Sequence, residues 1–144
     1  MFKKIHKVLI VMLVLLLPAI HVKAQLAELE NIDANWKQCL SSKTKGYRCA
    51  WKYFNALDSL LNATYTEMKS KLDSTDRADL RKNQSDWYIL RNRKFKKIEV
   101  ESHQFGFSGP DVEMNIVTEK AKVFRNRIIY LAGWKPGAAK QEDS

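Results

Sequence analysis

The sequence predicts an all-α fold: a small antiparallel helical bundle of three main helices, preceded by a shorter N-terminal helix and carrying one disulfide. Apolar residues recur at intervals of three and four over long stretches, which is the period of an amphipathic helix. No stretch shows the strict alternation of apolar and polar residues that indicates a half-buried strand. The 144 residues, 45% hydrophobic and 28% charged, have the length and composition of one globular domain.

The first 24 residues have the form of a secretory signal peptide. A lysine-rich start is followed by an apolar run over residues 8–20, and then by Val22 and Ala24, which suit a processing site. We expect cleavage after Ala24 and a mature chain that begins at Gln25. A retained membrane anchor is the alternative, but the 13 residues of the run are fewer than the ~20 that a spanning helix needs. The expected location is periplasmic or secreted, with no stable membrane span after cleavage.

The charge and histidine content restrict the chemistry of the exported chain. The full sequence has 25 Lys and Arg against 16 Asp and Glu, a formal net charge of +9. Removing the signal takes away four lysines and no acid, which leaves 21 basic residues and a net charge of +5. Two of the three histidines leave as well, so the lone His103 argues against a histidine metal site or a Cys/His nucleophile. We expect no metal, no cofactor, no catalytic residue and no nucleic-acid partner.

Cys39 and Cys49 are the two cysteines of the chain. Oxidising compartments form and keep disulfides, so in an exported protein the simplest expectation is a bond between them. Closing so short a loop would stabilise the fold by roughly 3 kcal/mol. The alternative is a pair of reduced, partly buried thiols, and the spacing does not fit a Cys-x-x-Cys redox motif.

The first two helices are expected on either side of a polar turn. A short amphipathic helix is predicted over residues 26–38, where Leu29 and Trp36 lie among charged residues. Residues 41–46 are polar, end in glycine and are expected to form the turn. The next helix is predicted over residues 49–72. Its apolar stripe consists of Phe54, Leu57, Leu61, Tyr65, Met68 and Leu72.

Two further helices complete the bundle. Turn and cap residues at 73–75 precede a helix predicted over residues 76–100, and its apolar face carries Leu80, Trp87, Leu90 and Ile98. After a loop at 101–109, the last helix is predicted over residues 110–133, with the apolar residues Val117, Ala121, Phe124, Ile128 and Leu131. The expected division of the chain is a signal peptide at 1–24, a helical domain at 25–133 and a disordered tail at 134–144.

Two spaced patterns stand out on the second and third expected helices. They read Asp58-x-x-Leu61-Asn62-x-x-Tyr65, nine residues after Cys49, and Leu80-x-x-x-Gln84-x-x-Trp87-x-x-x-Arg91. In these residues the chain resembles the lysozyme inhibitor LprI-like family of small exported bacterial proteins. The resemblance extends over about residues 39–95, nearly half of the mature chain.

The resemblance implies a protein that acts by binding and that inhibits lysozyme by occluding its cleft. The two motif helices are expected to pack directly against each other. Family members commonly carry a further cysteine where this chain has Phe95, and another in the last helix, where this chain has none. The loss of both leaves Cys39 and Cys49 to bond to each other.

Polar motif residues lie within or near the apolar helix faces. Gln84 and Arg91 fall in the same sector as Trp87. Asp58 lies near the apolar stripe of the preceding helix. Burying an unpaired guanidinium or carboxylate is costly, so we expect Arg91 to pair with Asp58 or to bond Asn62, which would fix the register of the two helices. The alternative is that these residues line a ligand cleft.

Two other features are candidate binding surfaces. A basic run begins at Arg91 and includes Arg93 and Lys96, which are candidate contacts with an anionic polymer. The alternative for this run is an ordinary solvated helix face. In the loop that follows, Phe105 and Phe107 are candidates for insertion into a groove of a partner, or they fold back and close one end of the bundle.

The predicted export signal and the resemblance together favour an exported binding protein, and the resemblance implies that its partner is a lysozyme or another envelope protein. Common lysozymes are cationic, so an inhibitor of net charge +5 gains no long-range steering and depends on local contacts. The alternative function is an envelope structural or adaptor protein that binds anionic cell-wall polymer through its basic helix. Polymer binding should collapse as ionic strength rises, whereas association with a like-charged enzyme should hold or improve. A hydrolase would need two carboxylates that converge in a cleft.

Overall fold

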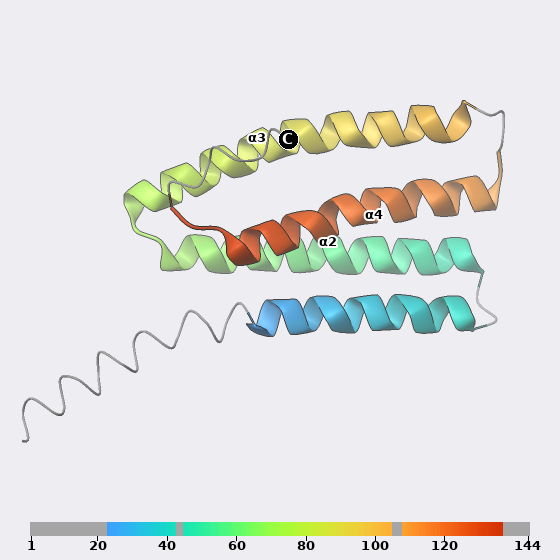
Figure 1. Ribbon diagram of the computed structural model, residues 1–144, viewed down its shortest axis with the longest axis horizontal. Helices are drawn as coiled ribbons and strands as arrows, with labels where there is room; N and C mark the ends of the chain where they lie inside the picture. Colours follow the sequence, from blue (N-terminus) through green and yellow to red (C-terminus); the bar gives the residue numbers. More distant parts are fainter. Residues whose placement is uncertain (1–22, 43–44, 105–107, 137–144) are drawn as a thin grey trace, which may run out of the picture.

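The computed structural model describes residues 23–42, 45–104 and 108–136 and shows an all-α protein (Figure 1). No strand occurs within these three ranges. The helices are an N-terminal helix described over 23–41, α2 at Gly46–Lys71, α3 at Ser74–His103 and α4 at Pro110–Gly133. The predicted fold class is confirmed.

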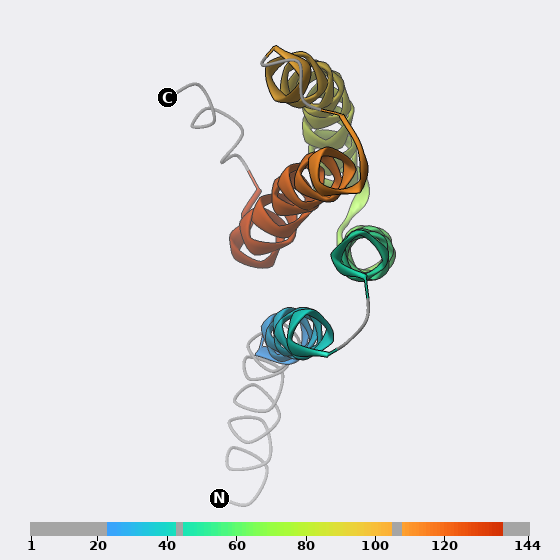
Figure 2. The same ribbon diagram turned by 90° about the vertical axis from the view of Figure 1, so that its right-hand side faces the viewer.

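Successive helices run in opposite directions, as predicted (Figure 1). The N-terminal helix and α3 lie at opposite edges of the bundle, and α2 and α4 lie between them (Figure 2). Because α2 and α4 are separated by one helix in the chain, they run in the same direction. They pack against each other, and α4 also packs against α3. The central pair therefore connects the two outer helices.

Small residues allow α2 and α4 to approach each other closely. Ala50 of α2 and Ala121 of α4 have no exposed surface. At the first residue of α2, a Cβ atom on Gly46 would lie only 2.5 Å from the sulfur of Met114. Gly46 is the first residue of α2, so its prediction as part of the turn is wrong. A side chain at this position would have to displace Met114.

One hydrophobic core joins all four helices. Its buried members are Leu29, Ile32, Tyr53, Leu57, Leu61, Leu80, Trp87, Ala121, Phe124, Ile128, Leu131 and Trp134. Removal of this apolar surface from water supplies the main driving force for folding. Leu61 of α2 and Trp87 of α3 thus share one core.

The two motif helices meet through side chains of the shared core, as predicted, but their backbones do not approach each other closely. α2 and α3 have little backbone contact, because the apolar face of α4 lies against both of them. Side chains still meet across this side of the bundle, where the ring centroids of Phe54 and Phe95 are 6.3 Å apart. The ring of Phe124 from α4 contacts both, with centroids 4.9 Å from Phe54 and 5.6 Å from Phe95.

A disulfide and a group of polar contacts attach the N-terminal helix to the rest of the bundle, in addition to its core residues. A disulfide joins Cys39, near the end of this helix, to Cys49 in the first turn of α2, with 5.7 Å between their Cα atoms. Halfway along the helix, Asp33 accepts a hydrogen bond of 2.7 Å from the Tyr53 hydroxyl and one of 2.9 Å from Nε of Arg125. The predicted disulfide is confirmed. The helix extends further at both ends than the predicted residues 26–38.

Capping residues set the starts of α3 and α4. Oδ1 of Asp73 accepts hydrogen bonds from the backbone N–H groups of Thr75 and Asp76, each at 2.9 Å. This cap starts α3 two residues before the predicted position, because Asp73 alone is the cap and Ser74 and Thr75 are already helical. Gly109, with φ of 111°, precedes Pro110 at the first turn of α4. The bounds of α4 agree with the prediction.

Within the described residues, no helix has both the length and the apolar character needed to cross a membrane. Residues 1–22 of the expected signal peptide (1–24) and residues 137–144 of the expected tail (134–144) lie outside the described ranges. Trp134, which the expected tail includes, is instead buried in the core. The signal peptide and the rest of the tail remain expectations from the sequence.

Candidate functional site

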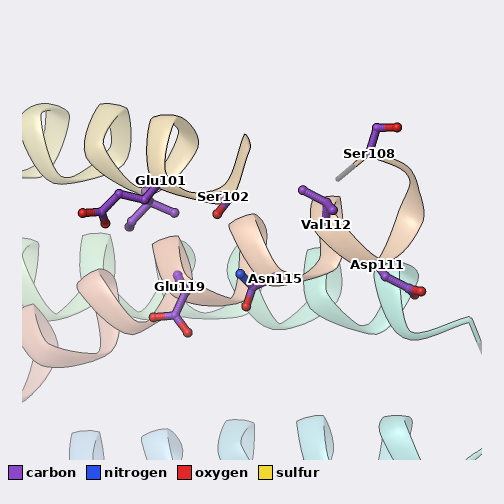
Figure 3. Close-up of a pocket in the computed structure, with 8 residues that line it drawn as sticks. Glu101, Ser102, Ser108, Asp111, Val112, Asn115 and Glu119 are labelled. Carbon is purple, nitrogen blue, oxygen red and sulfur yellow. The ribbon is translucent and has the colours of Figure 1, made fainter. Parts of the chain in front are cut away.

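A groove opens between the C-terminal end of α3 and the N-terminal end of α4 (Figure 3). Its volume is about 670 Å³. The lining combines apolar, hydroxyl, amide and carboxylate side chains, those of Ile98, Glu101, Ser102, Ser108, Asp111, Val112, Asn115 and Glu119. The two helices and the segment just before α4 therefore build one surface of mixed chemistry.

The charged side chains that line this groove are carboxylates, although the chain as a whole is basic. Glu101, Asp111 and Glu119 point in three different directions (Figure 3). Glu101 forms an ion pair of 3.6 Å with Lys97, and Glu119 forms one with Lys122. A pair of carboxylates that acted on one substrate bond would have to converge on it, and these three do not. The groove instead offers separate anionic contacts that suit basic side chains of a partner.

An ion pair holds α3 and α4 together beside the groove. Nζ of Lys120 on α4 donates a hydrogen bond to Glu99 on α3. This hydrogen bond, with the positive charge of Lys120, lowers the pKa of Glu99 below its ordinary value of 4.5. The Lys120 ammonium also lies 5.4 Å from the ring centroid of Phe95. These contacts hold the two helices together at the groove.

A buried arginine links the same two helices further along the bundle. Arg127 is 1% exposed, and its Nε and Nη2 donate hydrogen bonds to Oε1 of Gln84 at 3.1 and 2.9 Å. Nη2 also donates to Oδ1 of Asn83 at 2.6 Å, and the Asn83 amide donates to the Tyr130 hydroxyl at 3.0 Å. The guanidinium carbon lies 5.2 Å from the ring centroid of Trp87. Polar acceptors and ring faces thus stabilise the buried cation.

The family model described as Lysozyme inhibitor LprI matches residues 34–131, from the middle of the N-terminal helix to near the end of α4. The chain belongs to this family. No curated protein and no solved structure matches the chain. The LprI match includes parts of all four helices and therefore most of the common core.

The LprI-like motif residues divide into a buried group and a surface group. The buried group consists of Leu61, Leu80, Gln84 and Trp87. Gln84 and Trp87 contact Arg127, so the motif of α3 contributes directly to the attachment of α4. The surface group consists of Asp58, Tyr65 and Arg91, which are half-buried, and Asn62, which is exposed.

The predicted pairing of Arg91 is wrong. Its Nε and Nη2 donate to Oδ1 of Asn92, the next residue of α3, at 3.2 and 2.9 Å. Its guanidinium also lies over three rings of its own helix, those of Trp87, Tyr88 and Phe95. In the described part of the chain no hydrogen bond or ion pair joins Arg91 to Asp58 or Asn62. α4 lies between α2 and α3 and keeps their polar motif residues apart. The buried arginine that bonds Gln84 is therefore Arg127 of α4 and not Arg91.

A second groove, of about 500 Å³, lies beside the disulfide between the N-terminal helix and α2. Its walls include the stacked rings of Trp36 and Tyr53, whose centroids are 5.1 Å apart. Neither this groove nor the α3–α4 groove is lined by Asp58, Asn62 or Arg91. The motif residues proposed as the lining of a cleft therefore do not line either groove.

The other candidate binding residues lie on or next to α3. Arg93 and Lys96 are exposed on this helix and have no ion-pair partner among the described residues. Phe105 and Phe107 lie outside the described residues, so their role stays a prediction. No group of three or more His, Cys, Asp or Glu side chains is arranged as a metal site in the three described ranges.

The sequence interpretation missed Arg127 and the α3–α4 groove. Arg127 lies three residues after Phe124 and four before Leu131, which is the spacing of the apolar stripe on α4. A charged residue in an apolar stripe is a detectable signal for a buried polar site. The groove had no comparable signal, because Glu101 and Asp111 line one surface only when the two helix ends lie side by side.

Proposed function

We propose that this protein is exported and inhibits lysozyme by binding to it, without chemistry of its own. The observation that carries the proposal is the LprI family match, which extends over most of the bundle. The form of residues 1–24 supports export, and the Cys39–Cys49 disulfide suits an oxidising compartment. Lysozyme acts on cell walls outside the cytoplasm, so an inhibitor has to meet it there.

The α3–α4 groove is the surface that we propose for the contact with lysozyme. Two cationic proteins repel each other at long range, so productive contact needs a local region of opposite charge. Glu101, Asp111 and Glu119 supply such a region at one end of an otherwise basic chain. Basic side chains of the enzyme would reach these carboxylates, while Ile98 and Val112 add apolar contact area.

Inhibition through this end of the bundle would be steric. Lysozyme cleaves its polysaccharide with two carboxyl groups that flank the bond in a cleft, so a protein bound across the mouth of the cleft excludes the substrate. The groove is built mainly on two helices that the Glu99–Lys120 pair holds together. A preformed surface loses little conformational entropy when it binds, which favours affinity.

The test is a lysozyme activity assay with the purified protein, against several structural types of lysozyme and over a range of salt concentrations. We expect saturable inhibition of at least one type. We also expect inhibition to hold as ionic strength rises, because salt screens the repulsion between the two cationic proteins as well as the groove contacts. A protein that inhibits no type of lysozyme at any salt concentration would contradict the proposal.

The contribution of the groove is tested separately with Glu101→Gln/Asp111→Asn. This variant should raise the inhibition constant about tenfold, since rim charges contribute mainly to local complementarity. The matched control is Glu28→Gln/Glu30→Gln on the exposed side of the N-terminal helix, which removes the same charge and should leave inhibition unchanged. An equal effect of both variants would show that net charge matters and the groove does not.

A further inference from the structure

The outer face of α3 points away from the rest of the bundle. α3 lies at one edge of the molecule (Figure 2). Among the described helices, α4 is the one with which α3 has substantial backbone contact. On the side opposite its buried residues, the helical repeat brings together five residues spaced by one, three or four positions. These are Ile89, Arg93, Lys96, Lys97 and Val100, which we call the outer face of α3.

This outer face is basic, and most of its charge is not neutralised within the protein. Arg93 and Lys96 are exposed and have no ion-pair partner among the described residues, and neither has the neighbouring Lys94. Lys97 forms only a long contact of 3.6 Å with Glu101, and its side chain is 73% exposed. An exposed pair of this kind leaves most of the field of the lysine available to a partner.

Apolar side chains stand at both ends of the basic residues. Ile89 is 53% exposed and Val100 is 52% exposed, the two highest values among the large exposed hydrophobic residues of the described chain. Eleven positions of helix separate them, or ~16 Å along the axis. The face therefore combines positive charge with two projecting aliphatic groups.

We propose that the outer face of α3 docks on an anionic lipid surface. Basic side chains at a membrane surface attract acidic headgroups, at about 1 kcal/mol for each Lys or Arg. Projecting apolar side chains add affinity by entering the boundary between headgroups and acyl chains. A soluble polyanion would satisfy the basic residues, but it would leave Ile89 and Val100 in water. The lipid surface accounts for both features.

Docking in this way is compatible with the proposed contact with lysozyme. Ile98, Ser102 and Glu101 line the α3–α4 groove from the side of α3 that faces α4, away from Ile89 and Val100. A protein held on a membrane by its outer face would keep the groove accessible. The inference does not depend on the proposed inhibition, because lipid binding is measured without lysozyme.

The experiment is co-sedimentation of the purified protein, after signal cleavage, with vesicles of phosphatidylglycerol and phosphatidylcholine. We expect binding to vesicles that contain phosphatidylglycerol, little binding to pure phosphatidylcholine, and weakening as salt rises. Arg93→Glu/Lys96→Glu should lower the partition coefficient at least about tenfold. Ile89→Ser/Val100→Ser should lower it several-fold without changing the net charge.

The matched control is Lys37→Glu/Lys52→Glu, which makes the same change in charge at exposed positions of the N-terminal helix and α2. Its partition coefficient should stay within about twofold of that of the unmodified protein. An equal loss in this control would overturn the proposal, because binding would then follow net charge alone. Unchanged binding by Ile89→Ser/Val100→Ser, with full displacement by soluble cell-wall polyanion, would also overturn it and indicate a polymer ligand.

Discussion

Arg127 of α4 donates two hydrogen bonds to a single atom, Oε1 of Gln84 on α3, at 3.1 and 2.9 Å. The guanidinium is almost completely buried, and the hydrogen bonds that it makes to Gln84 and Asn83 are all to neutral acceptors. A charge in the interior is stable only when such contacts replace its hydration. The attachment of α3 to α4 therefore depends on a side chain that belongs to the LprI-like motif.

Gln84→Leu should lower the free energy of unfolding by about 2 to 3 kcal/mol, because it removes the acceptor of two hydrogen bonds from a buried cation. In Gln84→Leu/Arg127→Met the charge is removed as well, so the double variant should be more stable than the sum of the single variants predicts. Urea unfolding of the four proteins measures the coupling. Arg91→Met is the comparison, and it should cost less than about 1 kcal/mol because Arg91 is half-exposed. Additive single and double variants would contradict this account of Arg127.

Cys39→Ala/Cys49→Ala should lower the free energy of unfolding by about 3 kcal/mol, since the open loop gives the unfolded chain more conformational entropy. The protein without modification, unfolded in urea with and without a thiol reductant, should show the same difference. The variant should not respond to the reductant, because Cys39 and Cys49 are the two cysteines of the sequence. Equal stability of the reduced and oxidised proteins would count against a stabilising role of the bond.

Gly109→Ala should destabilise the protein by about 1 kcal/mol, because φ of 111° is unfavourable for a residue with a Cβ atom. Gly133→Ala is the matched change at the other end of α4. Neither position has an atom within 4 Å of the added methyl group, so crowding does not contribute. Gly133→Ala should stabilise the protein by about 0.5 kcal/mol, because alanine has less freedom to lose on folding. Thermal unfolding of both variants checks the opposite signs.

The Tyr53 hydroxyl should make the protein less stable at alkaline pH. Burial, and then its hydrogen bond to Asp33, raise the pKa of Tyr53 above its ordinary value of 10.0. Below pH 10 the hydroxyl is protonated in both states and its contribution is complete. As pH rises further, the unfolded chain loses this proton first, so the free energy of unfolding falls.

Urea unfolding from about pH 8 to about pH 11 measures this dependence. Tyr53→Phe should cost about 1 kcal/mol at neutral pH through the lost hydrogen bond, and it should flatten the alkaline decline. Burial also raises the pKa of Tyr65, so Tyr65→Phe is the appropriate control and should flatten the decline less. A decline that is identical in Tyr53→Phe and in the unmodified protein would exclude Tyr53 as its cause.

Much of the fold could be predicted because its signals are local. The apolar stripe and the flanking Gly109 and Gly133 gave the bounds of α4 correctly. Residues 73–75 predict a cap before α3, but the sequence does not show that Asp73 alone is the cap and that the helix already begins at Ser74. The polar run that ends at Gly46 predicts a turn there, whereas Gly46 begins α2 beside Met114, a residue far along the chain that gives no local signal.

The sequence by itself determined that the chain forms amphipathic helices and that its two cysteines can bond, because helical period and cysteine number are properties of the chain alone. Only the tertiary structure decided that α4 lies between α2 and α3, that Arg127 and not Arg91 is buried, and that Glu101 and Asp111 line the same groove. Each apolar stripe can pack against any other, so the pairing of stripes depends on how all four helices fill one core together. The observed pairing of stripes minimises the exposed apolar surface of the whole bundle, and this cannot be predicted from any single segment.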